Sequence, residues 1–211
     1  MITITEAQQY YKDADAIHDF DHIVRVLALV ERIGEAEGAD MEIVRTAALL
    51  HDMDRERSEA AGLDHAAVAA QKAYRILSAA GHPMERVEAV VHAIAAHRFR
   101  TPPDPVTLEA RVLFDADKLD AIGAVGIARA FAYGGAHGQR LWVPRDTVGL
   151  SHWQAEGDDP NNHTPVHEFV VKLSRLKERL FTPTAQAMAE DRHAYMTAFF
   201  DRLDAEVRGM R

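Results

Sequence analysis

Three short stretches of the sequence carry side chains that can bind a metal ion. DHIVRVL at 21–27 contains His22, AALLHDMD at 47–54 contains His51 and Asp52, and VLFDADKLDAIG at 112–123 places Asp117 among apolar residues. A buried carboxylate is costly unless a cation or a set of donors compensates its charge. Two imidazoles and two carboxylates suit Mn, Fe, Co, Ni, Zn or Mg better than a soft metal. Such an ion could activate water and polarise a phosphoryl oxygen.

Each stretch also has an ordinary structural explanation. Acidic residues near His22 suit the positive end of a helix, His51 suits the negative end of one, and Asp117 could form a salt bridge. Asp115 and Asp120 add negative charge around Asp117, which a divalent cation would balance. The four candidate ligands are 29, 1 and 65 residues apart, so their spacing alone does not establish a metal site.

The helices that would position these residues follow from the apolar pattern. Apolar residues recur every three or four positions and no segment alternates like a strand, so the predicted fold class is all-α. We expect a capping box from Thr3 to Glu6, an N-cap at Asp40, and a helix break near Gly123 or at Gly134–Gly135. The expected helices cover about 3–15, 19–37, 41–52, 64–80, 83–97, one or two within 106–135, 166–181 and 184–208.

Connecting segments are predicted where this pattern stops. Residues 54–62 and 98–105 are expected to be loops or turns. The stretch 134–165 is a loop of unusual length for a compact domain, and such loops often act as lids or are partly disordered. We therefore expect one domain over residues 1–211, with a core at about 18–135 and C-terminal helices at about 166–208.

Composition narrows the classes of function. The 211 residues are 47% hydrophobic and 27% charged, with 12 histidines, no cysteine and a net charge of −9. The negative charge disfavours binding to a nucleic acid polymer or an anionic membrane. No apolar run approaches the roughly 20 residues of a membrane span, and no signal peptide is recognised. We expect a cytoplasmic protein.

Together, the three stretches resemble the signatures of the HD-domain metal-dependent phosphohydrolase superfamily: a histidine, a His-Asp doublet and a distant aspartate. The resemblance spans about residues 18–135 and extends into 126–135 and 175–203, which are similar to a branch of small bacterial HD hydrolases. It implies an HD-domain helical bundle with a C-terminal helical extension. It also implies that His22, His51, Asp52 and Asp117 bind a divalent ion, with Mn²⁺ favoured and Mg²⁺, Co²⁺, Ni²⁺, Fe²⁺ or Zn²⁺ as alternatives.

Other polar residues near these motifs are candidates for catalysis or substrate binding. Asp54 and Glu56 could orient the attacking water, although both also suit a solvated acidic turn. His65 and His97, at expected helix ends, could contact the substrate or the water. The candidates for substrate binding are His18, Arg55, Lys118 and Arg98.

The expected function is hydrolysis of a nucleotide, because some members of this branch resemble (deoxy)nucleoside triphosphate pyrophosphohydrolases. The alternatives are a nucleotide monophosphatase or phosphodiesterase of the same superfamily, and a non-catalytic module that binds a metal or a nucleotide. No GYP triplet follows, and no Glu-Asp pair adjoins the doublet, which disfavours cyclic-dinucleotide phosphodiesterases and alarmone hydrolases. Extra histidines for a two-metal oxygenase do not cluster in the sequence. The expected partner is a small phosphorylated molecule, and a homodimer is left open.

Overall fold

The computed structural model describes residues 2–11, 20–98, 102–148 and 163–211. Within these ranges the chain forms helices and no strand, which confirms the predicted all-α class. None of the described helices is both long enough and apolar enough to cross a lipid bilayer. In chain order the elements are α1 (Ile4–Gln8), η1 (Gln9–Tyr11), α2 (Phe20–Glu37), α3 (Met41–Leu50), α4 (Arg55–Ala60), α5 (His65–Ala79), α6 (Met84–Ala95), α7 (Leu108–Asp120), α8 (Gly123–Ala136), η2 (Arg145–Thr147), α9 (Pro165–Val171), η4 (Leu173–Arg179) and α10 (Pro183–Val207).

The chain divides into two units, each with its own internal contacts. Unit 1 comprises Met1–Asp117 and Phe181–Ala185, and unit 2 comprises Lys118–Leu180 and Gln186–Arg211. The boundary between them falls inside α7. The organisation as one domain stays a prediction.

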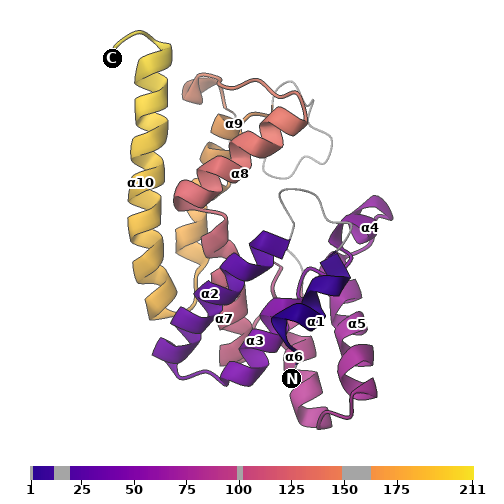
Figure 1. Cartoon of the computed structure of the whole chain (residues 1–211). Coiled ribbons are helices and arrows are strands. Elements are labelled where there is room, and N and C mark those ends of the chain that lie inside the picture. The colour runs from indigo at the N-terminus through magenta and orange to yellow at the C-terminus, as the bar shows by residue number, and fades with distance from the viewer. Residues whose placement is uncertain (1, 12–19, 99–101, 149–162) are drawn as a thin grey trace. The chain divides into compact units, whose positions relative to one another are not determined.

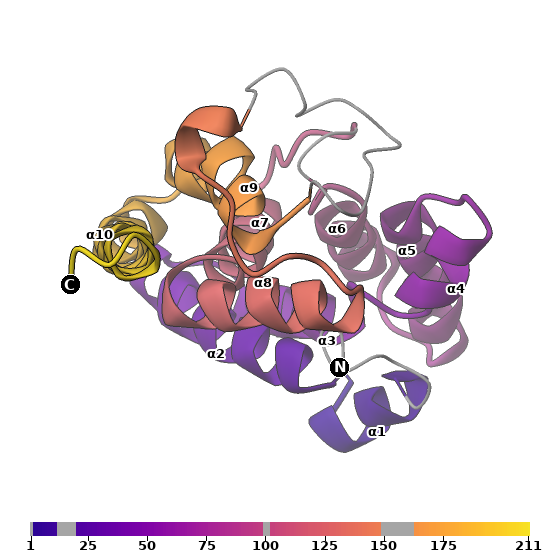
Figure 2. The same cartoon turned by 90° about the horizontal axis from the view of Figure 1, so that it is seen from above.

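The core of unit 1 forms where the apolar faces of its helices meet. Helix α3 packs against α2 and α6, and α5 packs against α6 and α4. Both views show α4 beside α5 and α5 beside α6 (Figure 1, Figure 2). Ile23, Ile33, Leu50, Ile94 and Leu113 are fully buried there. Burial of aliphatic side chains of this size contributes about 1.5–3 kcal/mol each.

Two predicted helix starts are confirmed in detail. The Thr3 hydroxyl accepts from the Glu6 amide while the Glu6 carboxylate accepts from the Thr3 amide, which makes the expected capping box. The Asp40 carboxylate accepts from the amides of Glu42 and Ile43 and so caps α3. Both signals lie within four residues of sequence, which is why they are readable without the fold.

Helix α4 lies where the sequence predicts a loop or a turn. It has only 6 residues, of which Ser58 alone is buried, so it carries no apolar period to detect. It starts after Asp54, whose backbone is left-handed with φ 57° and ψ 26°. Arg55 and Glu59 then pair at the spacing that stabilises a helix, with 3.1 Å between Nε and Oε1.

A buried carboxylate on α7 holds the segment before α10 within unit 1. Asp115 is fully buried and accepts hydrogen bonds from the Phe181 amide (2.9 Å), the Thr182 amide (2.8 Å) and the Thr182 hydroxyl (2.7 Å). Burial raises the pKa of Asp115, and these three donors oppose the rise. The charge that the sequence assigns to a cation here is therefore balanced by protein donors.

The predicted helix break lies within unit 2. Gly123 has φ +77°, a conformation that glycine adopts without strain, and α8 starts there. Asp120, buried just before the break, accepts from Arg129 at 2.8 Å, so its charge is also balanced by a protein partner. Helix α8 packs against α9. The Phe169 ring stacks on Phe200 with centroids 4.3 Å apart.

The segment 166–181, predicted as one helix, is α9 followed by the 3₁₀ segment η4. In α9 the Glu168 carboxylate pairs with Lys172 at 2.5 Å and with His163 at 3.3 Å. The predicted long loop includes η2, and its residues 149–162 lie outside the described ranges.

Candidate metal centre

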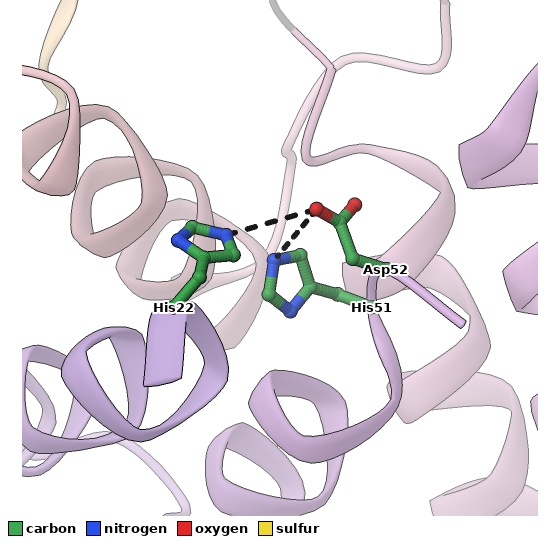
Figure 3. A group of neighbouring side chains, drawn as sticks. All are labelled: His22, His51 and Asp52. Carbon is green, nitrogen blue, oxygen red and sulfur yellow. Dashed lines mark ion pairs between the residues drawn. The ribbon is translucent and has the colours of Figure 1, made fainter. Parts of the chain in front are cut away.

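Unit 1 brings together the four residues proposed as metal ligands. His22 lies in the first turn of α2, His51 and Asp52 follow the last turn of α3, and Asp117 lies near the end of α7. His22 Nε2 is 3.7 Å from Asp52 Oδ2 and 3.5 Å from Asp117 Oδ1, while His51 Nε2 is 3.8 Å from Asp52 Oδ2. Figure 3 shows both rings turned toward the Asp52 carboxylate.

The adjacent pair His51–Asp52 can converge because it stands at a helix end. Leu49 and Leu50 are buried and fix the last turn of α3 in the core. His51 Nδ1 then lies 2.8 Å from the carbonyl oxygen of Ala48, to which it donates. Its Nε2 is thereby left as an acceptor that faces Asp52.

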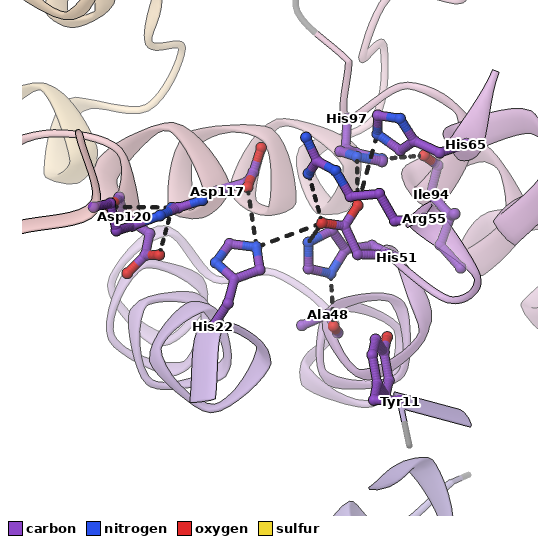
Figure 4. Close-up of polar contacts among 12 residues, drawn as sticks. Tyr11, His22, Ala48, His51, Arg55, His65, Ile94, His97, Asp117 and Asp120 are labelled. Carbon is purple, nitrogen blue, oxygen red and sulfur yellow. Dashed lines mark hydrogen bonds and ion pairs between the residues drawn. The ribbon is translucent and has the colours of Figure 1, made fainter. Parts of the chain in front are cut away.

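Two further histidines lie against the other oxygen of Asp52. His65 Nε2 is 3.7 Å and His97 Nε2 is 3.5 Å from Asp52 Oδ1. His97 donates from Nδ1 to the carbonyl oxygen of Ile94 at 2.6 Å (Figure 4). These histidines do not cluster in the sequence, so the sequence does not predict a second group of metal-binding side chains. The structure corrects this, because it groups His65 and His97 with Asp52. His65 opens α5 and His97 follows α6, so only the packing of α5 against α6 joins them.

The donor atoms meet the requirements of a cation site. Two groups each offer one ligand atom per residue, with these atoms within 4.8 Å of one another: His22, His51 and Asp52, and Asp52, His65 and His97. All five side chains are buried. Among the described residues, His51 Nε2 and Asp52 Oδ1 are buried atoms that make no hydrogen bond. Such atoms are costly in a folded protein unless an ion or water satisfies them. A divalent ion fits this set of imidazole and carboxylate donors.

The protonation states also suit cation binding. Burial lowers the pKa of the His51 imidazole to about 4, against the opposing charge of Asp52. Burial alone would raise the pKa of Asp52, but the Arg55 guanidinium and His51 hold it well below its usual range. At neutral pH the site therefore presents a neutral imidazole and an ionised carboxylate, the forms that bind metals.

Arg55, a predicted substrate-binding residue, contacts the site directly. Its Nη1 lies 2.8 Å from Asp52 Oδ2, the same oxygen that faces His22 and His51. The Arg55 side chain is 24% exposed and that of Asp52 is 1% exposed. The Arg55 guanidinium thus balances the charge of the Asp52 carboxylate from the more exposed side of the pair.

The two acidic residues proposed to orient water lie in different surroundings. The Asp54 carboxylate pairs with Lys72 at 2.6 Å, and the Lys72 Nζ lies 5.3 Å from the centre of the Tyr10 ring. Glu56 is exposed in the first turn of α4. The catalytic roles of Asp54 and Glu56 stay predictions.

The other predicted substrate-binding residues are Arg98, Lys118 and His18, of which the structure describes the first two. Arg98 pairs with Asp64 at 3.1 Å, and Asp64 caps α5 by accepting from two amides. Lys118 follows Asp117 on α7 but belongs to unit 2. His18 lies outside the described residues.

Two residues that the sequence did not single out adjoin this site. Glu59 Oε1 lies 3.3 Å from His65 Nδ1, in addition to its contact with Arg55. Tyr11 is buried and donates from its hydroxyl to the carbonyl oxygen of Leu49 at 2.9 Å. Burial and the charge of Asp52 raise the pKa of Tyr11 well above its usual value. The spacing of Arg55 and Glu59 was the available sequence signal for Glu59, whereas no local signal marks Tyr11.

Comparison with known proteins places the chain in one family. The family model of the HD domain matches residues 19–122. Bacillus subtilis YpgQ, a protein of uncharacterised function, is 35% identical over 210 residues, which cover 98% of this chain and 92% of YpgQ.

Solved structures agree with this match. The structure of Bacillus subtilis YpgQ in complex with ADP is similar with a TM-score of 0.73 and 34% identity, over 96% of this chain and 92% of that one. An HD-superfamily hydrolase from Bacillus thuringiensis has a TM-score of 0.73 and 31% identity, over 97% of this chain and 93% of that one.

Proposed function

Because the chain belongs to the HD-domain phosphohydrolase superfamily, we propose that it is a divalent-metal-dependent phosphohydrolase that acts on nucleotides. The observation that carries the proposal is the convergence of His22, His51, Asp52 and Asp117 from three separate segments of unit 1. Four protein donors leave room in the coordination of a six-coordinate ion such as Mn²⁺ for water and substrate. When bound, this ion lowers the pKa of water and polarises a phosphoryl oxygen.

The protein side chains supply the remaining chemistry. His97 donates its Nδ1 proton to a main-chain carbonyl, so its Nε2 is an acceptor that can take a proton from the attacking water. His65 Nε2 lies at the same oxygen of Asp52 and can contact the substrate. Asp54 and Glu56 follow the doublet, and we propose that they help to orient the water.

Cationic side chains would neutralise the phosphate. Arg55 is beside the site, and its planar guanidinium suits two phosphate oxygens at once. We assign secondary roles in phosphate binding to Lys118, Arg98 and His18. Charge that develops on the phosphoryl group is stabilised most by donors that are already in place.

The proposed substrate is a nucleoside triphosphate, cleaved to a monophosphate and pyrophosphate. The ADP bound to YpgQ supports a nucleotide as ligand, and the branch resemblance supports pyrophosphohydrolysis. The absence of cysteine fits a reducing cytoplasm, in which we propose that the reaction takes place.

A nucleotide panel with Mn²⁺ tests this function. The purified chain is expected to hydrolyse at least one nucleotide, and a chelator should abolish the reaction. Asp117→Ala is expected to lose about 100-fold or more in kcat/KM, since a ligand-deficient site binds metal and substrate poorly. The matched control is Asp146→Ala, at an exposed aspartate of η2, which should keep full activity. Full activity of Asp117→Ala, or indifference to the chelator, would refute the assignment.

The products distinguish the alternatives. Pyrophosphate release identifies a pyrophosphohydrolase, and orthophosphate release identifies a phosphatase. If Mn²⁺ raises the melting temperature but no phosphate ester is hydrolysed, the chain is a non-catalytic metal- or nucleotide-binding module.

A second candidate is a two-metal site, favoured by the second donor group Asp52, His65 and His97. Asp52 belongs to both donor groups, so His65 and His97 would help to hold a second ion, which metal-dependent oxygenation would also need. The metal content of the purified chain decides between a one-metal site and a two-metal site. One ion per chain excludes the two-metal reaction, and two ions per chain favour it.

A further inference from the structure

The carboxylate of Glu59 connects two side chains that both reach Asp52. Glu59 Oε1 accepts a hydrogen bond from Arg55 Nε at 3.1 Å and lies 3.3 Å from His65 Nδ1, so a single oxygen contacts both side chains. Arg55 and His65 come from different helices, α4 and α5. Glu59 is therefore a link between two helices as well as half of a helical ion pair.

These two side chains approach opposite oxygens of Asp52. Arg55 Nη1 is 2.8 Å from Oδ2, and His65 Nε2 is 3.7 Å from Oδ1. Asp52, Arg55, Glu59 and His65 thus form a closed ring of contacts in which carboxylates alternate with nitrogen-bearing side chains. Displacement of Glu59 would loosen both contacts to Asp52 at once.

The starts of helices α4 and α5 fix the positions of Arg55, Glu59 and His65 in this ring. The left-handed backbone of Asp54 starts α4, which puts Arg55 and Glu59 one helical turn apart on the same face. The Asp64 carboxylate accepts from two amides of α5, and this cap fixes His65 as the first residue of that helix.

We propose that Glu59 is a positioning residue of the candidate metal centre. By accepting a hydrogen bond from the Nδ1–H of His65, it leaves the Nε2 lone pair free on the side that faces Asp52, as the main-chain carbonyls do for His51 and His97. By sharing the charge of Arg55 it also limits how strongly Arg55 competes with a metal ion for Asp52 Oδ2. The part concerning metal affinity rests on the proposed function, and the part concerning His65 does not.

An ordinary surface ion pair is the competing explanation. The Glu59 side chain is 50% exposed, and exposed pairs of this spacing usually stabilise only the helix that carries them. Helix α10 offers a matched control, because Arg202 and Glu206 form the same Arg-to-Glu pair at the same spacing. If Glu59 acts only as a helical partner, its loss should resemble that of Glu206.

The experiment compares Glu59→Ala, Glu59→Gln and Glu206→Ala. Titration calorimetry with Mn²⁺ is expected to show about tenfold weaker binding for Glu59→Ala and no change for Glu206→Ala. In the metal-free chain, nitrogen-15 NMR of the neutral imidazole should show His65 carrying its proton at Nδ1. Glu59→Ala should shift this proton toward Nε2, and Glu59→Gln, which keeps an acceptor, should restore Nδ1.

The two measurements separate this proposal from the proposed function. If Glu59→Ala leaves both the Mn²⁺ affinity and the His65 tautomer at the values of the parent chain, the positioning role is refuted. If the parent chain binds no Mn²⁺, the proposed function fails, but the tautomer still decides whether Glu59 positions His65. Melting temperatures of the three variants confirm that each is folded.

Discussion

Replacing Arg55 by methionine removes the cation nearest to Asp52 while keeping most of the apolar stem of the side chain. In the metal-free chain the buried Asp52 carboxylate then loses the partner that lies 2.8 Å from its Oδ2. A bound divalent ion would supply the missing charge at the same oxygen. The substitution should therefore be costly without metal and much less costly with it.

The exposure of the pair sets the expected magnitude. Breaking a fully buried ion pair costs about 3–5 kcal/mol, whereas an exposed pair contributes about 0–1 kcal/mol. Asp52 is 1% exposed and Arg55 24% exposed, so the pair lies between these limits, and we expect a loss of about 2 kcal/mol without metal. With saturating Mn²⁺ the loss should fall to about 0.5 kcal/mol. The difference of about 1.5 kcal/mol corresponds to Mn²⁺ binding about tenfold tighter in Arg55→Met.

Urea unfolding with a chelator and with saturating Mn²⁺ measures both losses, and calorimetry measures the affinity. Arg202→Met, which breaks the equivalent pair in α10, should cost less than about 0.5 kcal/mol under both conditions. The expected change in affinity is opposite in sign to that of Glu59→Ala. An equal loss of stability with and without Mn²⁺ would refute the idea that Arg55 and the ion neutralise the same carboxylate oxygen.

Three further predictions concern the folding of each unit. Asp115→Ala leaves three donors without their acceptor and should lower the free energy of unfolding by about 2–4 kcal/mol in urea, whereas Asp115→Asn, which keeps one acceptor, should lose less. Burial would raise the pKa of Glu168, but a neighbouring lysine and histidine lower it from the usual 4.5 to about 2. The contribution of Glu168 to the free energy of unfolding is therefore complete above pH 4.5 and is lost as the pH falls to about 2. Glu168→Gln should remove up to about 3 kcal/mol of this pH dependence, which urea unfolding from neutral to acidic pH would measure. Gly126→Ala would place Cβ 2.2 Å from a main-chain carbonyl oxygen and should cost about 3 kcal/mol in thermal unfolding, whereas Gly135→Ala on the same helix, with nothing within 4 Å, should gain about 0.5 kcal/mol.

Features of the fold that depend on neighbouring residues were predictable. The caps at Thr3 and Asp40 and the break at Gly123 each follow from residue types within a few positions. Helix α4 was missed because it buries only Ser58 and depends instead on the left-handed turn at Asp54. The 3₁₀ winding of η4 was missed because its apolar spacing also fits an α-helix.

The candidate site was predictable only in part, for a similar reason. The motifs identify His22, His51, Asp52 and Asp117 by resemblance, and the structure places them together. His65 and His97 lie 32 residues apart in sequence, so only the pairing of α5 with α6 makes them neighbours. Their assembly around Asp52 is therefore a tertiary property.

The hydrogen bonds from Phe181 and Thr182 to Asp115 have a consequence for the order of folding during synthesis. The 63 residues of Lys118–Leu180 belong to unit 2. The candidate metal ligands therefore leave the ribosome well before Phe181 and Thr182 can form their hydrogen bonds to Asp115 in unit 1. A nascent chain that ends at Leu180 carries every proposed ligand but leaves Asp115 buried without its donors. Unit 1 should therefore reach its full stability only after the C-terminal residues are released, and a chain truncated after Leu180 should unfold at a lower urea concentration than the full chain.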